Sequence, residues 1–234
     1  MRPTLLFTIL MAVSFSSLSS GTEGRPAPGS SADFGDSSPA FAPVEESAGL
    51  PRVLLIGDSI SVGYTIGVRE LLMGKANVHR IPENGGPTSR GVANIEAWLG
   101  DGHWDVIHFN WGLHDIKYME DGKRQVSEDD YAANLRLLVK RMKETGATLI
   151  WCSTTPVPAG DLNPRRQTAD VPLYNAIARE IMEEEGIAID DLYAFVLPRE
   201  KDLQIPVNVH FTEIGSAALA EEVATCIKRY LGEG

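Results

Sequence analysis

The chain has 234 residues, a formal net charge of −11 and only two cysteines. An acidic surface repels nucleic-acid phosphates and anionic lipid headgroups, so the charge argues against both as partners. Residues 51–234 are long enough for one domain with a full core and too short for two ordinary domains.

The first 20 residues predict a secretory signal peptide, because a positive start at Arg2 precedes an apolar stretch (5–15) and small residues (16–21). The apolar stretch is too short to span a bilayer, so we expect no stable membrane anchor after cleavage and a secreted or periplasmic protein. Residues 21–50 are rich in Gly, Pro, Ala and Ser and predict a flexible linker.

The predicted domain opens with a buried strand, 52–57, that ends in Gly57-Asp58-Ser59 before a helix over 62–73. A serine between a strand and a helix lies where open α/β sheets bind ligands. Free backbone N–H groups there can receive a developing negative charge. Taken alone, Ser59 is more often a helix cap than a nucleophile. The rest of the chain decides between the two.

Two further strand ends carry polar residues. The strand 77–82 leads to paired glycines, Gly85 and Gly86, whose uncovered N–H groups suit an oxyanion site, and then to a helix over 90–99. The strand 105–110 runs into a glycine turn that holds His114 and Asp115. These strand ends are expected to meet on one rim of the sheet.

A histidine stands directly before the last predicted helix, 212–231. Thr212 is its expected N-cap. From this position His210 can reach a strand-end serine and act as its general base. A surface or capping role is the alternative, and the Gly-Asp-Ser start of the domain weakens it.

Strands and helices alternate along the whole domain. The remaining expected elements are helix 128–145, strand 147–152, helix 170–185 and strand 187–190. This alternation predicts an α/β fold with a parallel sheet covered on both faces, a three-layer α/β/α sandwich.

Four segments in this order resemble the blocks of the SGNH hydrolases, the GDSL-type esterases and lipases. The resemblance covers about residues 52–232 and implies a flavodoxin-like sheet of about five strands. Each block alone is a weak signal, whereas four in register are specific. The blocks are Gly57-Asp58-Ser59-Ile60, Gly86-Pro87-Thr88-Ser89, Gly112-Leu113-His114-Asp115 and Val209-His210-Phe211-Thr212.

The resemblance implies a serine esterase centre. Ser59 is then the nucleophile and His210 the base. The N–H groups of Ser59 and Gly86 donate to the oxyanion, and the third-block residue donates as well. Asp58 and Asp115 are expected to support the site.

The third block departs from the family pattern, because His114 replaces an asparagine. A neutral imidazole still donates one N–H, so the oxyanion role can survive. Histidine titrates near neutrality, so the role would depend on pH.

The fourth block departs as well, because Val207 occupies the position three residues before the histidine where the family carries its acid. Asn208 is the nearest polar candidate. An amide oxygen can accept the Nδ1 hydrogen, as in papain-like proteases. The alternative is a Ser–His dyad oriented by a backbone carbonyl or by a distant acid, Asp170 or Asp202.

No metal or cofactor is expected, because the five histidines lack ligand spacing and the cysteines, Cys152 and Cys226, form no cluster. The two cysteines fall on different layers, which favours unpaired thiols. Two loops that follow strand ends, 115–127 and 153–166, are candidates for substrate contact. Trp111 is either an aromatic wall for a sugar ring or a packing residue.

The predicted reaction is hydrolysis of short acyl esters on a small-molecule or glycan substrate. Family analogy points to O-acetyl groups on carbohydrates. A lysophospholipase or thioesterase is the enzymatic alternative. A non-catalytic glycan-binding homologue is the other, because the usual acid before His210 is missing.

Overall fold

A computed structural model describes Met1 and residues 38–232. Five parallel strands form one sheet in the order β2-β1-β3-β4-β5. This topology confirms the predicted α/β fold and strand number. The predicted signal peptide lies outside the described residues. The strands are β1 (Arg52–Ile56), β2 (Asn77–Arg80), β3 (Val106–Phe109), β4 (Thr148–Cys152) and β5 (Ala188–Asp190).

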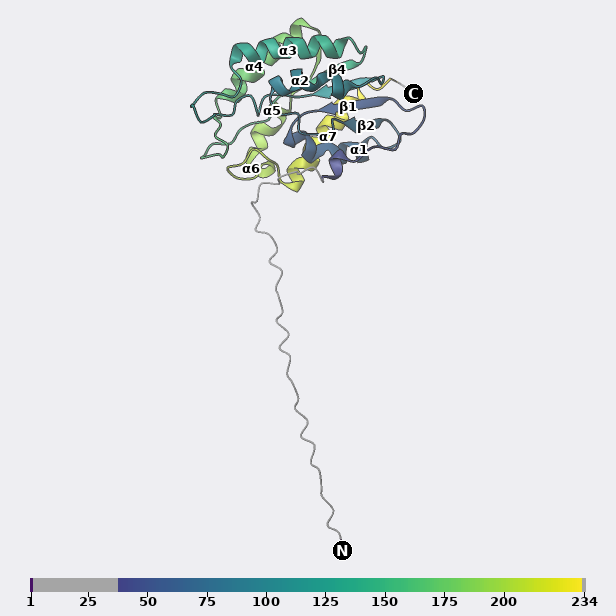
Figure 1. The fold of residues 1–234 in the computed structure, drawn as a ribbon, viewed down its shortest axis with the longest axis horizontal. Coiled ribbons are helices and arrows are strands. Elements are labelled where there is room, and N and C mark those ends of the chain that lie inside the picture. Colours follow the sequence, from purple (N-terminus) through teal and green to yellow (C-terminus); the bar gives the residue numbers. More distant parts are fainter. Residues whose placement is uncertain (2–37, 233–234) are drawn as a thin grey trace. The chain divides into compact units, whose positions relative to one another are not determined.

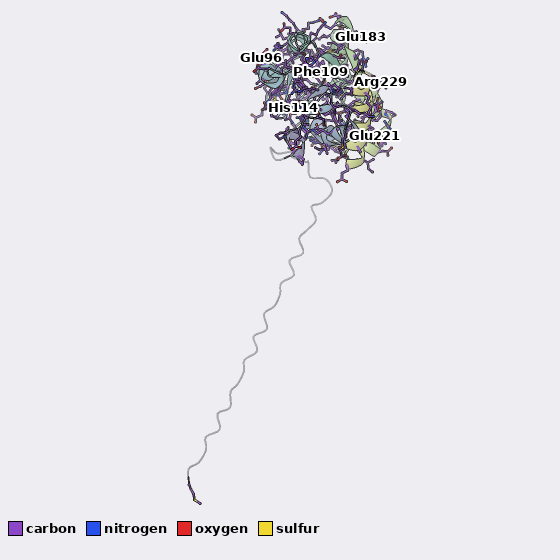
Figure 2. All side chains as sticks on the ribbon, turned by 90° about the vertical axis from the view of Figure 1, so that its right-hand side faces the viewer. Glu96, Phe109, His114, Glu183, Glu221 and Arg229 are labelled. Carbon is purple, nitrogen blue, oxygen red and sulfur yellow. The ribbon has the colours of Figure 1, made fainter. Side chains whose placement is uncertain are left out.

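Helices cover both faces of the sheet (Figure 1). α1 (Ser59–Leu71) and α7 (Glu213–Lys228) lie on one face, and α2 (Thr88–Leu99), α3 (Glu128–Lys143) and α4 (Asp170–Glu184) lie on the other. The central strand β3 is buried along its whole length, and Phe109 at its end lies inside the domain (Figure 2). Such continuous burial is what a parallel sheet with two helical layers requires.

The first helix begins earlier than the sequence predicts, at Ser59 instead of residue 62. Asp58 is its N-cap, and its Oδ1 accepts a hydrogen bond of 2.9 Å from the Ile60 N–H. Ser59 is therefore the first helical residue and does not serve as the cap. At the other end of the chain, Thr212 caps α7 as predicted, because its Oγ1 accepts from the Gly215 N–H.

Two segments differ from the predicted layout. Between β5 and α7 the chain forms three short pieces that were not predicted, α5 (Leu192–Val196), η2 (Leu197–Arg199) and α6 (Glu200–Leu203), which are too short to show periodicity. The described part of the predicted linker, 38–50, packs on the domain through a buried alanine in η1 (Pro39–Phe41). Within the part of the chain that the structure describes, no helix combines the length and the apolar character needed to cross a bilayer.

The close packing of α1 on α7 sets the distance between the serine and histidine loops. Gly67 faces Ala220, and a Cβ added to Gly67 would lie 2.7 Å from the Ala220 Cβ. Glycine here permits a helix–helix approach that a larger side chain would block. Because Ser59 begins α1 and His210 precedes α7, this contact brings the two side chains within reach of each other.

Gly67→Leu is expected to lower the free energy of unfolding by about 1–3 kcal/mol, because the added side chain overpacks the α1–α7 contact. Urea denaturation measures this loss. Ile66→Leu, a neighbouring exposed position, is the control and is expected to change little. Equal stability of the two variants would show that the helices do not depend on this close approach.

Candidate active site

The nucleophile and base candidates meet at the rim of the sheet. Ser59 Oγ and His210 Nε2 lie 2.9 Å apart, although the two residues are 151 positions apart in the sequence. This is hydrogen-bond distance, which proton transfer between a serine and its base requires. Ser59 stands on the first turn of α1, and His210 on the loop between α6 and α7.

Asn208, His210 and Ser59 form a chain of hydrogen bonds, here called the relay. Asn208 Oδ1 lies 2.8 Å from His210 Nδ1 and also accepts a 2.9 Å hydrogen bond from the His210 backbone N–H. An amide oxygen can only accept, so Nδ1 carries the hydrogen and Nε2 is free to accept the serine proton. The two distant acids lie elsewhere: Asp170 pairs with Arg124, and Asp202 is exposed on α6.

The histidine loop is held in an unusual backbone conformation. Val207 has a φ of +52°, which a β-branched side chain rarely adopts. Gln204 fastens the loop by donating from Nε2 to the carbonyls of Pro156 and Val209. Strain of this kind persists only where surrounding contacts impose it, and it is concentrated at functional sites. Here it occurs at the position where the family carries its acid.

A buried arginine organises the serine turn. Arg80, at the end of β2, donates through Nη2 to the carbonyls of Gly57 and Asp58 and to Ser61 Oγ. Through Nη1 it also donates to carbonyls of its own loop, those of Ile81 and Glu83. Burial lowers the pKa of Arg80 to about 10, so it stays charged at neutral pH. The role of Arg80 was not predicted, because β2 (Asn-Val-His-Arg) carries no local pattern that marks its last residue as buried.

A buried carboxylate joins the third block to the second. Asp115 is fully buried, and its Oδ1 accepts from the Thr88 N–H at 2.9 Å and from Thr88 Oγ1 at 2.5 Å. Burial raises the pKa of Asp115 to about 7, against the hydrogen bonds from Thr88. Asp115 does not line the cavity that contains Ser59, and its contacts to Thr88 are those of a residue that positions the second and third blocks.

The three predicted oxyanion donors differ in their surroundings. The Ser59 N–H lies in the first turn of α1, where backbone N–H groups have no intrahelical acceptor. The Gly86 N–H instead donates to Asn84 Oδ1 at 2.9 Å, so it reaches an oxyanion only when that bond opens. The His114 ring lines the cavity and has no hydrogen-bond partner among the described residues.

Both histidines of the site are biased towards the neutral form. Burial lowers the pKa of His210, and Arg166 lowers it further, while Asp58 opposes them. Burial also lowers the pKa of His114, with Lys117 and Arg166 acting in the same direction. A neutral His210 can accept a proton, and a neutral His114 can still donate one N–H.

The relay opens into a cavity of about 290 Å³. The two predicted contact loops supply part of its wall, whereas Trp111 is almost completely buried and packs on Gly91 instead of facing a sugar. Asn84, which was not predicted as a site residue, also lines the cavity. The lining residues are Asp58, Ser59, Asn84, Leu113, His114, Lys117, Leu162, Asn163, Pro164, Arg166, Val207, Asn208, Val209 and His210.

The sequence of residues 55–218 matches the GDSL-like Lipase/Acylhydrolase family. This match covers more than half of the chain. The protein belongs to this family. No curated protein sequence matches the chain significantly.

Solved structures of related hydrolases share the fold at low sequence identity. The lipase/acylhydrolase from Enterococcus faecalis aligns with a TM-score of 0.67 and 19% identity over 79% of this chain and 99% of its own. The acetyl xylan esterase AlAXEase aligns with a TM-score of 0.64 and 16% identity, over 75% of this chain and 99% of its own. A variant of an acetyl-xylooligosaccharide esterase from Geobacillus aligns with a TM-score of 0.61 and 22% identity, over 79% of this chain and 95% of its own.

Away from the serine, the hydrolase brings together three possible metal ligands that spacing did not reveal: His108, Cys152 and Asp190, from β3, β4 and β5. Their ligand atoms lie within 4.8 Å of one another, but His108 Nε2 is already hydrogen-bonded to Asp190 Oδ2 at 2.9 Å. His108 Nε2 and Asp190 thus satisfy each other, whereas His108 Nδ1 is buried with no hydrogen-bond partner among the described residues. Cys152 and Cys226 are buried free thiols.

The lowered pKa of His210 predicts that kcat/KM for a neutral ester rises with pH at a midpoint below 6.5. Asn208→Asp is expected to move this midpoint up by about one unit or more, because a carboxylate stabilises the imidazolium. The pH–rate profile measures both effects. Asn94→Asp, on α2, is the matched control, and a midpoint unchanged in Asn208→Asp would contradict the relay.

The raised pKa of Asp115 predicts a stability that falls with pH. The folded protein holds this proton up to about pH 7 and the unfolded chain only up to about 3.8, so stability declines across that window. Asp115→Asn is expected to remove this decline, as measured by urea denaturation between pH 4 and 7. Asp101→Asn, at an exposed position, is the control and should keep the wild-type slope.

Proposed function

We propose that this hydrolase is an exported serine esterase that removes short acyl groups, chiefly O-acetyl groups, from carbohydrates. The observation that carries the proposal is the chain of hydrogen bonds from Asn208 through His210 to Ser59, which ends inside a small cavity lined by polar and apolar side chains. A serine alone is a poor nucleophile, and an adjacent oriented imidazole activates it.

In the proposed reaction His210 Nε2 takes the Ser59 proton as Oγ attacks the ester carbonyl. The tetrahedral oxyanion receives hydrogen bonds from the Ser59 N–H, from His114 and from the Gly86 N–H once Asn84 releases it. His210 then protonates the departing alcohol. Water activated by the same histidine cleaves the acyl-enzyme and restores Ser59.

The small volume of the cavity and the side chains that line it favour a short acyl group. Its volume of about 290 Å³ lies at the lower end of the range for small-molecule sites. Polar and charged side chains make up most of the described residues that line the cavity wall. This wall favours an acetyl ester over the lysophospholipid alternative.

The carbohydrate part of the proposal is supported by analogy. Two of the structures that share the fold are named as esterases of acetylated xylan and xylo-oligosaccharides. Export is proposed from the signal-peptide pattern of residues 1–20.

Hydrolysis of p-nitrophenyl acetate, butyrate and octanoate tests the proposal. The acetate is expected to be the best substrate. Ser59→Ala should lower kcat by more than about 10⁴-fold, because the nucleophile is lost. Ser89→Ala, an exposed serine of the second block, is the control and should retain activity. Absence of wild-type hydrolysis of these esters and of acetylated xylan would instead favour a glycan-binding protein.

His114→Ala tests the oxyanion assignment separately. Loss of one donor is expected to lower kcat by about 10²–10³-fold, a severe effect but smaller than that of Ser59→Ala. Wild-type turnover in His114→Ala would show that the imidazole does not stabilise the oxyanion.

A further inference from the structure

The cavity beside Ser59 is cationic, although the protein as a whole carries a net charge of −11. Lys117 and Arg166 both line it, and among its described lining residues Asp58 is the sole acid. The Asp58 carboxylate already accepts the Ile60 N–H at the start of α1. The cavity therefore contains two basic groups and one acid that has its own partner.

Arg166 is a buried cation, with an exposed fraction of 8%, that forms no ion pair with a described residue. Burial lowers its pKa, and the charge of Asp58, which lines the same cavity, acts against this from beyond ion-pair distance. Arg166 Nε donates to the Leu113 carbonyl at 2.7 Å and Nη1 to the Pro164 carbonyl at 3.3 Å, while Nη2 donates to no described residue. An unpaired buried charge is costly. A bound anion would offset that cost.

Lys117 has similar surroundings. It is half-buried, and among the described residues its ammonium neither forms an ion pair nor donates a hydrogen bond. Burial lowers the pKa of Lys117, and the nearby charge of Arg166 lowers it further. The two cations thus lie close enough to repel each other, and Asp58 is the one acid among the described residues that line the cavity with them.

Some basic side chains elsewhere in the described residues are paired with acids, whereas Arg69 and Arg80 donate to backbone carbonyls. Arg124, Arg141 and Lys143, for example, each contact a glutamate or aspartate. The acidic surplus lies on exposed helical surfaces, as Glu96, Glu183 and Glu221 show at the periphery of the domain (Figure 2). A cleft with a net positive charge within such a surface concentrates the electric field on an anionic ligand.

We propose that the substrate is an acetylated anionic glycan, whose carboxylate or sulfate group binds Arg166 and Lys117 while its acetyl ester lies on Ser59. This inference rests on the proposed esterase function and adds the charge of the glycan. The anionic group lies on the same sugar as the ester or on the next one, because both cations line the cavity that contains Ser59. A guanidinium edge and an ammonium together suit such a group.

A competing role for the two cations is purely electrostatic: they would stabilise the oxyanion and hold His210 neutral. In that case they would accelerate hydrolysis of every ester equally. Two substrates that differ only in charge separate the two roles, because only a binding subsite makes the enzyme prefer the charged substrate.

The experiment measures acetate release from O-acetylated galacturonic acid oligosaccharides and from the same oligosaccharides after methyl esterification of every carboxylate. The two share the sugar and the acetyl group and differ in charge. We expect kcat/KM to be about tenfold or more higher for the charged form, a preference carried mainly by KM and weakened by salt. An O-acetylated, sulfated galactan oligosaccharide shows whether sulfate or carboxylate is the preferred anion.

Lys117→Met removes the ammonium and keeps the length of the apolar stem. The ratio of kcat/KM for charged over neutral oligosaccharide is expected to fall about fivefold to tenfold. Lys123→Met is the matched control, since Lys123 is exposed on the same loop and does not line the cavity, and it should keep the wild-type ratio. Arg166→Lys tests the guanidinium while a charge is retained.

A charged-to-neutral ratio near one in the wild-type enzyme, or an unchanged ratio in Lys117→Met, would overturn the anion subsite. If p-nitrophenyl acetate and neutral acetylated oligosaccharides were still hydrolysed, the esterase function would stand without it. Absence of hydrolysis of all these esters would overturn the proposed function, and the subsite with it.

Discussion

The buried guanidinium of Arg80 is the contact on which the geometry of the site depends. Its hydrogen bonds join the turn that presents Ser59 to the loop that carries the second block. These loops follow different strands, β1 and β2, and the Gly85 N–H also joins them by donating to the Gly57 carbonyl at 3.0 Å. Arg80 reinforces this backbone contact and helps to set the position of the nucleophile relative to the second-block glycine.

Two further contacts complete the same rim. Asp115 holds the third-block turn to the start of α2 through Thr88, and the Gly67–Ala220 approach holds α1 against α7. Together with Arg80 they cross-link all four sequence blocks in space. The two departures from the family pattern fall on side chains that this framework presents: His114 faces the cavity, and Asn208 accepts from His210 twice.

The five strands could be predicted from the sequence, because β1, β3 and β4 are short, mostly apolar runs that alternate with predicted helices. Ser59, His210 and Asn208 were predictable from local motifs, since each occupies a recognisable strand or helix end. Arg80 and Arg166 were not, because their importance lies in which carbonyls they reach. The His108–Asp190 contact, across 82 positions, depends on neighbouring strands that only the fold brings together. The sequence predicts the start of α1 three residues late, because it offers Ser59 as a possible cap and the structure uses Asp58.

The central claim is that Ser59 forms a covalent intermediate with the help of His210. Labelling with a fluorophosphonate ester followed by peptide mass spectrometry tests it directly. The account predicts one adduct, on Ser59, that is absent in Ser59→Ala and strongly slowed in His210→Ala. An adduct on another residue, or ester hydrolysis by Ser59→Ala at the wild-type rate, would contradict it.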